Sequence, residues 1–183
     1  MLVQSNPLEK GTKAPAFSLP DTVSDAVLSL EDVRGEHGTI MMFICNHCPF
    51  VIHVNEELIR LAKDYQAKGI GFVAISSNDA NFVPQDGPQY MKRQAAALGY
   101  PFPYLYDESQ EVAKEYDAAC TPDFYIFDAD LRSVYHGQLD DSRPGSSIPV
   151  TGSAMRNVLD TMLKGASYTG EERPSIGCNI KWK

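Results

Sequence analysis

The sequence has little positive charge and no long apolar segment. Sixteen lysines and arginines stand against 24 aspartates and glutamates, giving a net charge of −8. Nucleic acids and anionic membranes bind basic patches, so we expect neither as a partner. No stretch approaches the roughly 18 consecutive apolar residues of a membrane helix, and residues 1–13 contain no apolar segment of signal-peptide length. These absences favour a cytoplasmic protein.

Cysteine is also scarce. Four cysteines in 183 residues are too few for a disulfide scaffold. In a reducing compartment a close pair is more often catalytic or metal-binding than structural. The composition is 43% apolar and 22% charged, as in an average soluble protein, so a core can form without cross-links. The length predicts one domain, residues 1–183, with an aperiodic C-terminal tail from about residue 166.

The first half of the chain predicts a strand, a helix and a second strand. Residues 39–44 form a short apolar run bounded by turn residues, which is typical of a strand buried on both faces. Apolar residues then recur at helical spacing from Val51 to Tyr65, and residues 71–75 form another buried strand. This order and spacing indicate a right-handed crossover between parallel strands.

The second half predicts an antiparallel hairpin among further helices. The turn Asp128-Ala129-Asp130 separates strands at residues 123–128 and 133–136. Asp107 is predicted to cap one helix. The other predicted elements are a strand at 103–106 and helices at 88–98, 108–116 and 153–163. Together they predict an α/β fold with a central mixed sheet and helices on both faces.

The segment Cys45-Asn46-His47-Cys48 lies where the first buried strand meets the long helix. A thiol is nucleophilic as thiolate, and a helix N-terminus stabilises this anion with partial positive charge and free N–H groups. We therefore expect Cys45 to attack a disulfide, and Cys48, one helical turn on, to resolve the mixed disulfide. The motif and its location predict a thiol–disulfide oxidoreductase.

Three segments together resemble the redoxin branch of the thioredoxin superfamily, which includes the alkyl-hydroperoxide-reductase/thiol-specific-antioxidant proteins. They are residues 11–21, 45–49 and 120–124, and residues 175–183 are similar to a subgroup of uncharacterised peroxiredoxin-like bacterial proteins. The likeness covers nearly the whole chain and implies a thioredoxin-like fold. It further implies a cis peptide bond between Thr121 and Pro122 that faces the cysteine pair, with the Thr121 backbone pairing with a substrate chain.

The chain departs from both branches of this superfamily. Thr39 stands where thioredoxin has a buried acid that helps to deprotonate the second thiol. The peroxiredoxin pattern Pro-x-x-x-Thr-x-x-Cys precedes neither Cys45 nor Cys48, which weakens a direct peroxidase function. His47 lies where a strongly oxidising periplasmic disulfide oxidase has its histidine. That likeness implies that the imidazole lowers the pKa of Cys45 and makes the couple oxidising.

Two alternatives to disulfide exchange remain open. One is an antioxidant thiol peroxidase using the same cysteines, and the other is a copper- or zinc-binding module without turnover. Cys45, His47, Cys48 and His53 are a conceivable ligand set, although we expect no metal because the motif supplies only two convincing ligands.

The remaining cysteines are candidates for further redox roles. Cys120 adjoins Thr121, and a core position is as compatible with the sequence as a redox role. Cys178 lies in the tail. Trp182 suggests that this tail docks on the domain. We expect a disulfide or peroxide substrate and a cellular thiol reductant as partners, and no organic cofactor, since no glycine-rich phosphate loop is present.

Overall fold

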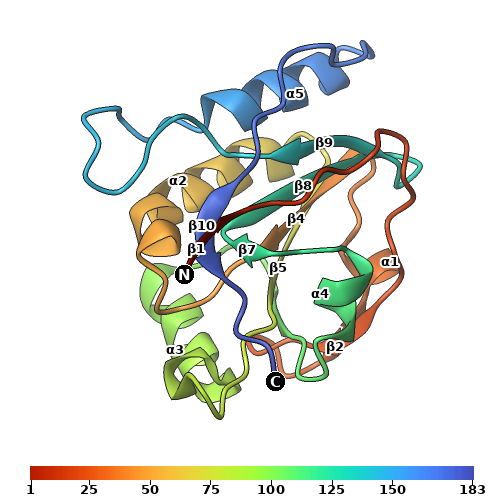
Figure 1. Ribbon diagram of the computed structural model, residues 1–183. Coiled ribbons are helices and arrows are strands. Elements are labelled where there is room, and N and C mark those ends of the chain that lie inside the picture. Colours follow the sequence, from red (N-terminus) through yellow and green to blue (C-terminus); the bar gives the residue numbers. More distant parts are fainter.

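A five-stranded mixed sheet forms the centre of the computed structural model, which describes all residues from 1 to 183 (Figure 1). Its strand order is β6 (Tyr104–Tyr106), β5 (Ile70–Ser76), β4 (Gly38–Phe43), β8 (Asp123–Asp128) and β9 (Ser133–Gly137). The strands β4, β5 and β6 run parallel, whereas β8 is antiparallel to both β4 and β9. The register places Phe43, the last residue of β4, opposite Asp123 of β8.

Helices cover both faces of this sheet (Figure 1). Alternate β4 residues such as Ile40 and Met42 share a core with three helices, α2 (Pro49–Gln66), α3 (Pro88–Leu98) and α5 (Ser153–Leu163). The intervening residues Met41 and Phe43 pack on the opposite face with α1 (Leu30–Val33) and α4 (Glu111–Glu115). Because β4 is buried on both faces, its sequence is a continuous apolar run.

Two smaller sheets flank the central one. β2 (Ser18–Pro20) pairs with β3 (Val27–Ser29), and β10 (Ile176–Asn179) lies between β1 (Leu2–Gln4) and β7 (Cys120–Thr121). The first and last strands of the chain therefore lie side by side, next to the segment that leads into β8 (Figure 1). A single 3₁₀ turn, η1 (Pro84–Asp86), precedes α3. No helix is both long enough and apolar enough to cross a membrane.

Most predicted elements are confirmed, with three at the predicted bounds, namely α3, β8 and α5. The predicted cap of α4 is wrong, because Gln110 occupies the N-cap with a left-handed φ of 66°. Asp107 nevertheless stabilises the N-terminus of this helix, because its carboxylate accepts hydrogen bonds from the backbone N–H groups of Val112 and Ala113. The tail is not aperiodic throughout, because it contains β10.

Candidate active site

The two cysteines of the motif lie in the turn between β4 and α2. Cys48 is the N-cap of α2, and Pro49 is its first helical residue. Pro49 fits there because a first-turn residue has no intrahelical use for its N–H. Both thiols are buried, with 1% of Cys45 and 0% of Cys48 exposed.

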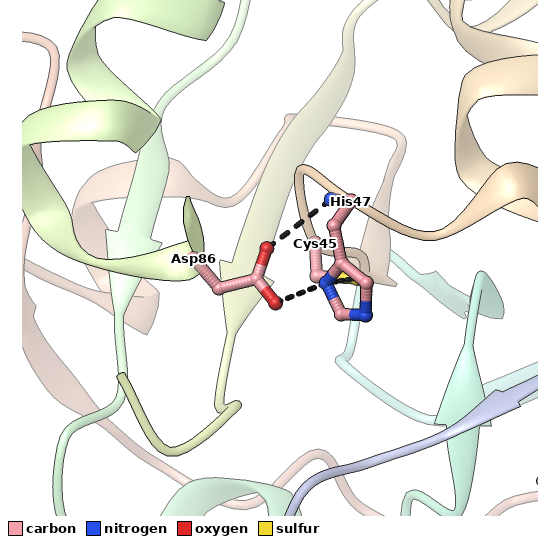
Figure 2. A group of neighbouring side chains, drawn as sticks. All are labelled: Cys45, His47 and Asp86. Carbon is pink, nitrogen blue, oxygen red and sulfur yellow. Dashed lines mark hydrogen bonds and ion pairs between the residues drawn. The ribbon is translucent and has the colours of Figure 1, made fainter. Parts of the chain in front are cut away.

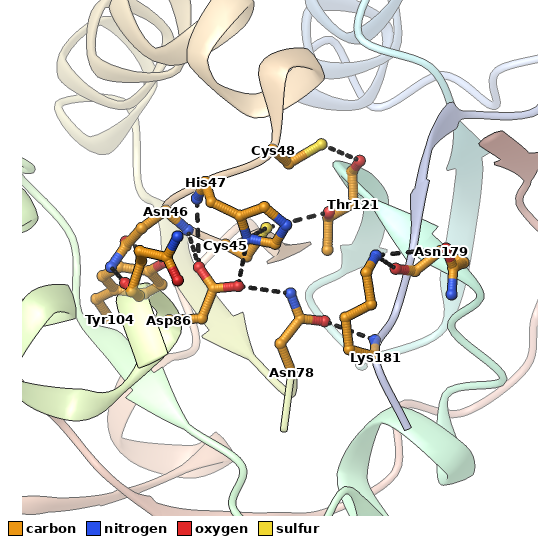
Figure 3. A network of polar contacts seen from close by, with 11 residues as sticks. Cys45, Asn46, His47, Cys48, Asn78, Asp86, Tyr104, Thr121, Asn179 and Lys181 are labelled. Carbon is orange, nitrogen blue, oxygen red and sulfur yellow. Dashed lines mark hydrogen bonds and ion pairs between the residues drawn. The ribbon is translucent and has the colours of Figure 1, made fainter. Parts of the chain in front are cut away.

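The Thr121–Pro122 peptide bond is cis, as predicted, and Thr121 contacts both thiols. The Thr121 hydroxyl oxygen lies 3.4 Å from Cys45 Sγ, and the protonated Cys48 thiol donates to the Thr121 carbonyl oxygen at 3.2 Å. The predicted catalytic pair and the predicted Thr121–Pro122 segment thus meet at one site (Figure 3). Thr39 lies in β4, where its hydroxyl oxygen accepts a hydrogen bond from the Gly35 N–H. The position that holds a buried acid in thioredoxin therefore has no ionisable group in this protein.

The prediction that the Thr121 backbone is free to pair with a substrate chain is wrong in this structure. β10 already pairs with β7 there, with Cys178 opposite Thr121 and Asn179 opposite Cys120. The physical reason is close main-chain approach: a Cβ on Gly177 would lie only 1.9 Å from the Thr121 carbonyl oxygen. Glycine at position 177 is therefore what lets the tail lie on this edge.

A buried carboxylate, Asp86 of η1, organises the loop between the cysteines. It is fully buried and accepts hydrogen bonds from the backbone N–H groups of Asn46 and His47, at 2.8 and 3.2 Å. It also accepts from His47 Nδ1 at 2.5 Å and from Asn78 Nδ2 at 2.8 Å. Figure 2 shows the imidazole between this carboxylate and Cys45. His47 Nδ1 lies 3.8 Å from Cys45 Sγ, so its stronger contact is with Asp86.

Asn46 completes the support of the loop. Its side chain donates to the Gln85 carbonyl oxygen at 2.7 Å and accepts from the Tyr104 hydroxyl at 3.0 Å. The side chains of Asn46 and His47 are therefore held by hydrogen bonds to residues of η1 and β6. Sequence reasoning assigned Asn46 and His47 to the site but missed Asp86, because an aspartate in a loop rich in proline and glycine has the pattern of a solvated residue.

We expect Asp86→Asn to destabilise the reduced protein by about 3 kcal/mol, because it turns a buried acceptor of four N–H groups into a partial donor. The free energy of unfolding is measured by urea denaturation. Asp25→Asn is the matched control, since Asp25 forms an exposed ion pair with Lys92 that contributes less than about 1 kcal/mol. Equal losses in the two variants would contradict the anchoring role of Asp86.

The two active-site thiols have opposite pKa shifts. The neighbouring Cys45 thiol is the largest cause that lowers the pKa of Cys48, to about 4, because a protonated Cys45 stabilises a Cys48 thiolate. Cys178 and the Val51 N–H, at the start of α2, lower it further, while burial opposes them. The pKa of Cys45 is raised above the ordinary thiol value by the neighbouring Cys48 thiol, by burial and by the Asp86 charge. These shifts favour a proton on Cys45 and a thiolate on Cys48, which would give up its hydrogen bond to the Thr121 carbonyl oxygen.

The prediction that Cys45 is the more acidic thiol stays a prediction, although the directions of these two shifts favour Cys48. Cys48, not Cys45, is the N-cap of α2, so the positive end of the helix favours the second sulfur. His47 does not offset this, because its nearest acceptor is Asp86, whose charge acts against a Cys45 thiolate. These contacts favour Cys48 over Cys45 as the attacking thiol.

The other two cysteines differ in their surroundings. Cys120 is fully buried, its pKa is raised mainly by burial, and its thiol donates only to the Pro122 carbonyl oxygen, at 3.8 Å. It is a core residue. Cys178 is partly exposed and packs against the core cluster that contains Cys48. The tail docks as predicted, but through β10 and not through Trp182, which is 43% exposed.

The ligand set suggested by the sequence is not assembled. His53 is turned away, with its Nε2 2.8 Å from the Ser142 hydroxyl. The structure instead groups one atom each of Cys45, His47 and Asp86 within 4.8 Å of one another. A metal ion there would have to displace the hydrogen bond between His47 and Asp86 and the proton of Cys45.

The mixed sheet, with a C-x-x-C motif at a helix start and a facing cis-proline, is a thioredoxin-like fold. The AhpC/TSA family matches residues 10–135, more than half of the sequence, so the chain belongs to this family. No curated protein matches it.

Three solved structures illustrate this relationship. An uncharacterized conserved protein from Geobacillus kaustophilus is 60% identical, with a TM-score of 0.98 over 100% of this chain and 97% of that one. A hypothetical protein from Sinorhizobium meliloti is 46% identical, with a TM-score of 0.95 over 98% of both chains. A secreted disulfide oxidoreductase from Mycobacterium tuberculosis shares the fold at 15% identity, with a TM-score of 0.59 over 79% of this chain and 95% of that one.

Proposed function

We propose that the protein is a thiol–disulfide oxidoreductase whose redox centre is the Cys45–Cys48 pair. The observation that carries the proposal is the geometry of the pair: Cys45 and Cys48 lie in the turn that leads into α2, and Thr121, which precedes cis-Pro122, contacts both sulfurs. The pKa of Cys48 is lowered to about 4, which favours a thiolate there. A thiolate of low pKa is present at neutral pH and is also a good leaving group. Membership of a redox family and the facing Thr121–Pro122 segment support the same function.

The exchange begins on the Cys48 sulfur. Its thiolate attacks one sulfur of a substrate disulfide, a mixed disulfide forms, and the other substrate sulfur leaves as a thiolate that takes up a proton. Cys45 then loses its proton and attacks the Cys48 sulfur, which releases the second substrate thiol. Two electrons pass to the substrate, which takes up one proton from Cys45 and one from solvent, and the Cys45–Cys48 disulfide is formed. A cellular thiol reductant reverses these steps on the protein.

Turnover with a regenerating thiol system tests this function. Disulfide reduction should proceed faster than the reaction of the same concentration of a free small thiol. A thiol peroxidase is the second candidate, favoured by membership of the AhpC/TSA family, and the same assay with hydrogen peroxide as oxidant examines it. A rate no faster than that of the free thiol with both oxidants would overturn both enzymatic functions.

We expect protein purified from a metal-replete culture to carry well under one zinc or copper ion per chain. The reason is that the grouped ligand atoms of Cys45, His47 and Asp86 already satisfy one another or keep a proton. Elemental analysis after dialysis measures the metal content, with Cys45→Ser as the control for adventitious binding. Stoichiometric copper that survives dialysis, together with no disulfide turnover, would instead establish a binding module.

A further inference from the structure

The C-terminal strand covers the active site with a cysteine of its own. β10 lies antiparallel to β7, and its register sets Cys178 directly opposite Thr121. Thr121 is the residue that contacts both active-site thiols, at Cys45 through its hydroxyl and at Cys48 through its carbonyl oxygen. Cys178 is therefore one strand away from the redox centre, although 130 residues separate it from Cys48 in the sequence.

β10 is held along both of its edges and just beyond its C-terminal end. β1 pairs with its other edge, and the Asn179 N–H donates to the Met1 carbonyl oxygen at 2.9 Å. Just beyond it, the Lys181 N–H donates to Asn78 Oδ1 at 2.9 Å, and Asn78 is the residue whose amide also binds Asp86 (Figure 3). The tail and the loop of the cysteine pair are thus parts of one hydrogen-bond network.

Cys178 also packs against the core cluster that contains Cys45 and Cys48. The proximity of Cys178 helps to lower the pKa of Cys48, and burial, followed by the proximity of Cys48, raises the pKa of Cys178 to about 11. In the reduced protein Cys178 is therefore expected to keep its proton.

Accessibility differs among these three cysteines. Cys45 and Cys48 have only 1% and 0% of their surface exposed. Cys178 is the one cysteine of the four that is partly exposed. A thiol or disulfide in solution meets Cys178 first.

We propose that Cys178 is a relay thiol, which carries electrons between the buried Cys45–Cys48 pair and a thiol or disulfide in solution through a Cys48–Cys178 disulfide. The proposal rests on the proposed function and adds the residue at which the outside partner reacts. The partner is a small thiol or an exposed protein dithiol, which needs to reach only the surface of β10.

The reductive direction consists of two exchanges. Cys178 attacks the Cys48 sulfur of the Cys45–Cys48 disulfide, so the bond to Cys178 forms, the bond to Cys45 breaks, and the proton of Cys178 passes to Cys45. An external thiol then attacks the exposed Cys178 sulfur, and Cys48 leaves as the thiolate, which is favoured because the thiol of lowest pKa leaves fastest. A second external thiol frees Cys178, so two external thiols become one disulfide and the protein gains two electrons. Oxidation by a disulfide follows the reverse path.

Peptide mapping tests the predicted bond. The protein is oxidised briefly with oxidised glutathione, alkylated in acid and digested with trypsin. Cleavage at lysine and arginine places Cys45 and Cys48 in one peptide, residues 35–60, and Cys178 in another, residues 165–181. A Cys48–Cys178 bond therefore links the two peptides, whereas a Cys45–Cys48 bond does not. We expect the link to accumulate in Cys45→Ser, which cannot release it, and to be absent in Cys48→Ser.

Reduction kinetics test the relay itself. Cys178→Ser keeps a hydroxyl donor toward Cys48 but cannot form a disulfide, and we expect it to slow reduction of the Cys45–Cys48 disulfide by dithiothreitol on the order of tenfold or more. Cys120→Ser, one residue from Thr121 in the paired strand, should leave the rate unchanged. Absence of the linked peptides in oxidised Cys45→Ser, or equal rates in wild type and Cys178→Ser, would overturn the relay.

The two proposals fail in different ways. If the wild-type protein forms the linked peptides and depends on Cys178 for its reduction but turns over no disulfide substrate, the oxidoreductase function fails and the relay stands. If substrate turnover is normal and the linked peptides never form, the relay fails alone.

Discussion

Replacement of Cys48 by serine is expected to abolish disulfide reduction, with turnover lower by on the order of 10³ or more. The lowered pKa of Cys48 makes it the expected thiolate of the reduced pair, and both Cys45 and Cys178 contribute to that shift. Serine forms no disulfide, so the substitution removes every disulfide available to the three neighbouring sulfurs apart from one between Cys45 and Cys178. The activity is measured as reduction of insulin with a regenerating thiol system, and Cys120→Ser is the control for loss of a buried cysteine.

Cys45→Ser should behave differently from Cys48→Ser. A serine hydroxyl at position 45 still donates toward the Cys48 sulfur, so a thiolate remains at neutral pH and reacts with iodoacetamide at pH 6. Cys48→Ser should lose this reactivity at pH 6, because the pKa of Cys45 is raised and that of Cys178 is about 11. Rapid alkylation of Cys48→Ser at pH 6, with none in Cys45→Ser, would restore the roles expected from position in the motif.

The fold is predictable from the sequence wherever local signals mark the ends of an element. α3 begins at Pro88 and ends before Gly99, whose φ of 70° is the left-handed conformation that glycine favours at a helix C-terminus. The sheet strand β4 is a continuous apolar run because both its faces are buried. These features depend on a few neighbouring residues, which is why a single sequence reveals them.

The parts of the site that escaped prediction depend on contacts between distant segments. Asp86 has the pattern of a solvated loop residue, and only the folded chain brings the backbone of the cysteine loop onto its carboxylate. Strand β10 contains Gly177 and Asn179, which are poor strand formers, and it is held by main-chain pairing with both β1 and β7. The presence of Cys178 was visible in the sequence, but its position opposite Thr121 was not.

The acidity of the two thiols shows the same limit at a finer scale. The C-x-x-C motif predicts that a helix N-terminus stabilises a thiolate, and it placed the helix start within a few residues of the observed one. Cys45 and Cys48 are three residues apart, and this spacing decides which thiolate the helix N-terminus stabilises, because the effect of the helix dipole falls off within the first turn. Helix ends are defined by sequence only to within a residue or two, so the motif could not assign the two roles.

The midpoint potential of the Cys45–Cys48 couple is expected to fall by about 30 mV per pH unit between about pH 5 and pH 8. An ordinary dithiol, whose thiols are both protonated in this range, takes up two protons with two electrons and changes by about 59 mV per pH unit. Here the pKa of Cys48 is lowered to about 4 and that of Cys45 is raised, so reduction takes up one proton. Over three pH units the two cases differ by about 90 mV, or three powers of ten in the equilibrium constant.

Equilibration with glutathione buffers of known ratio, followed by alkylation and mass spectrometry, measures this potential at each pH, with dithiothreitol in the same buffers as the two-proton reference. The free energy of unfolding of the reduced protein should also depend on the protonation of Cys48. Because the folded pKa of Cys48 lies below its unfolded value, the contribution of its thiolate is complete above the unfolded value and is lost as the pH falls toward about 4. A slope of about 59 mV per pH unit throughout would mean that both thiols are protonated at neutral pH, and the proposed thiolate on Cys48 would then be wrong.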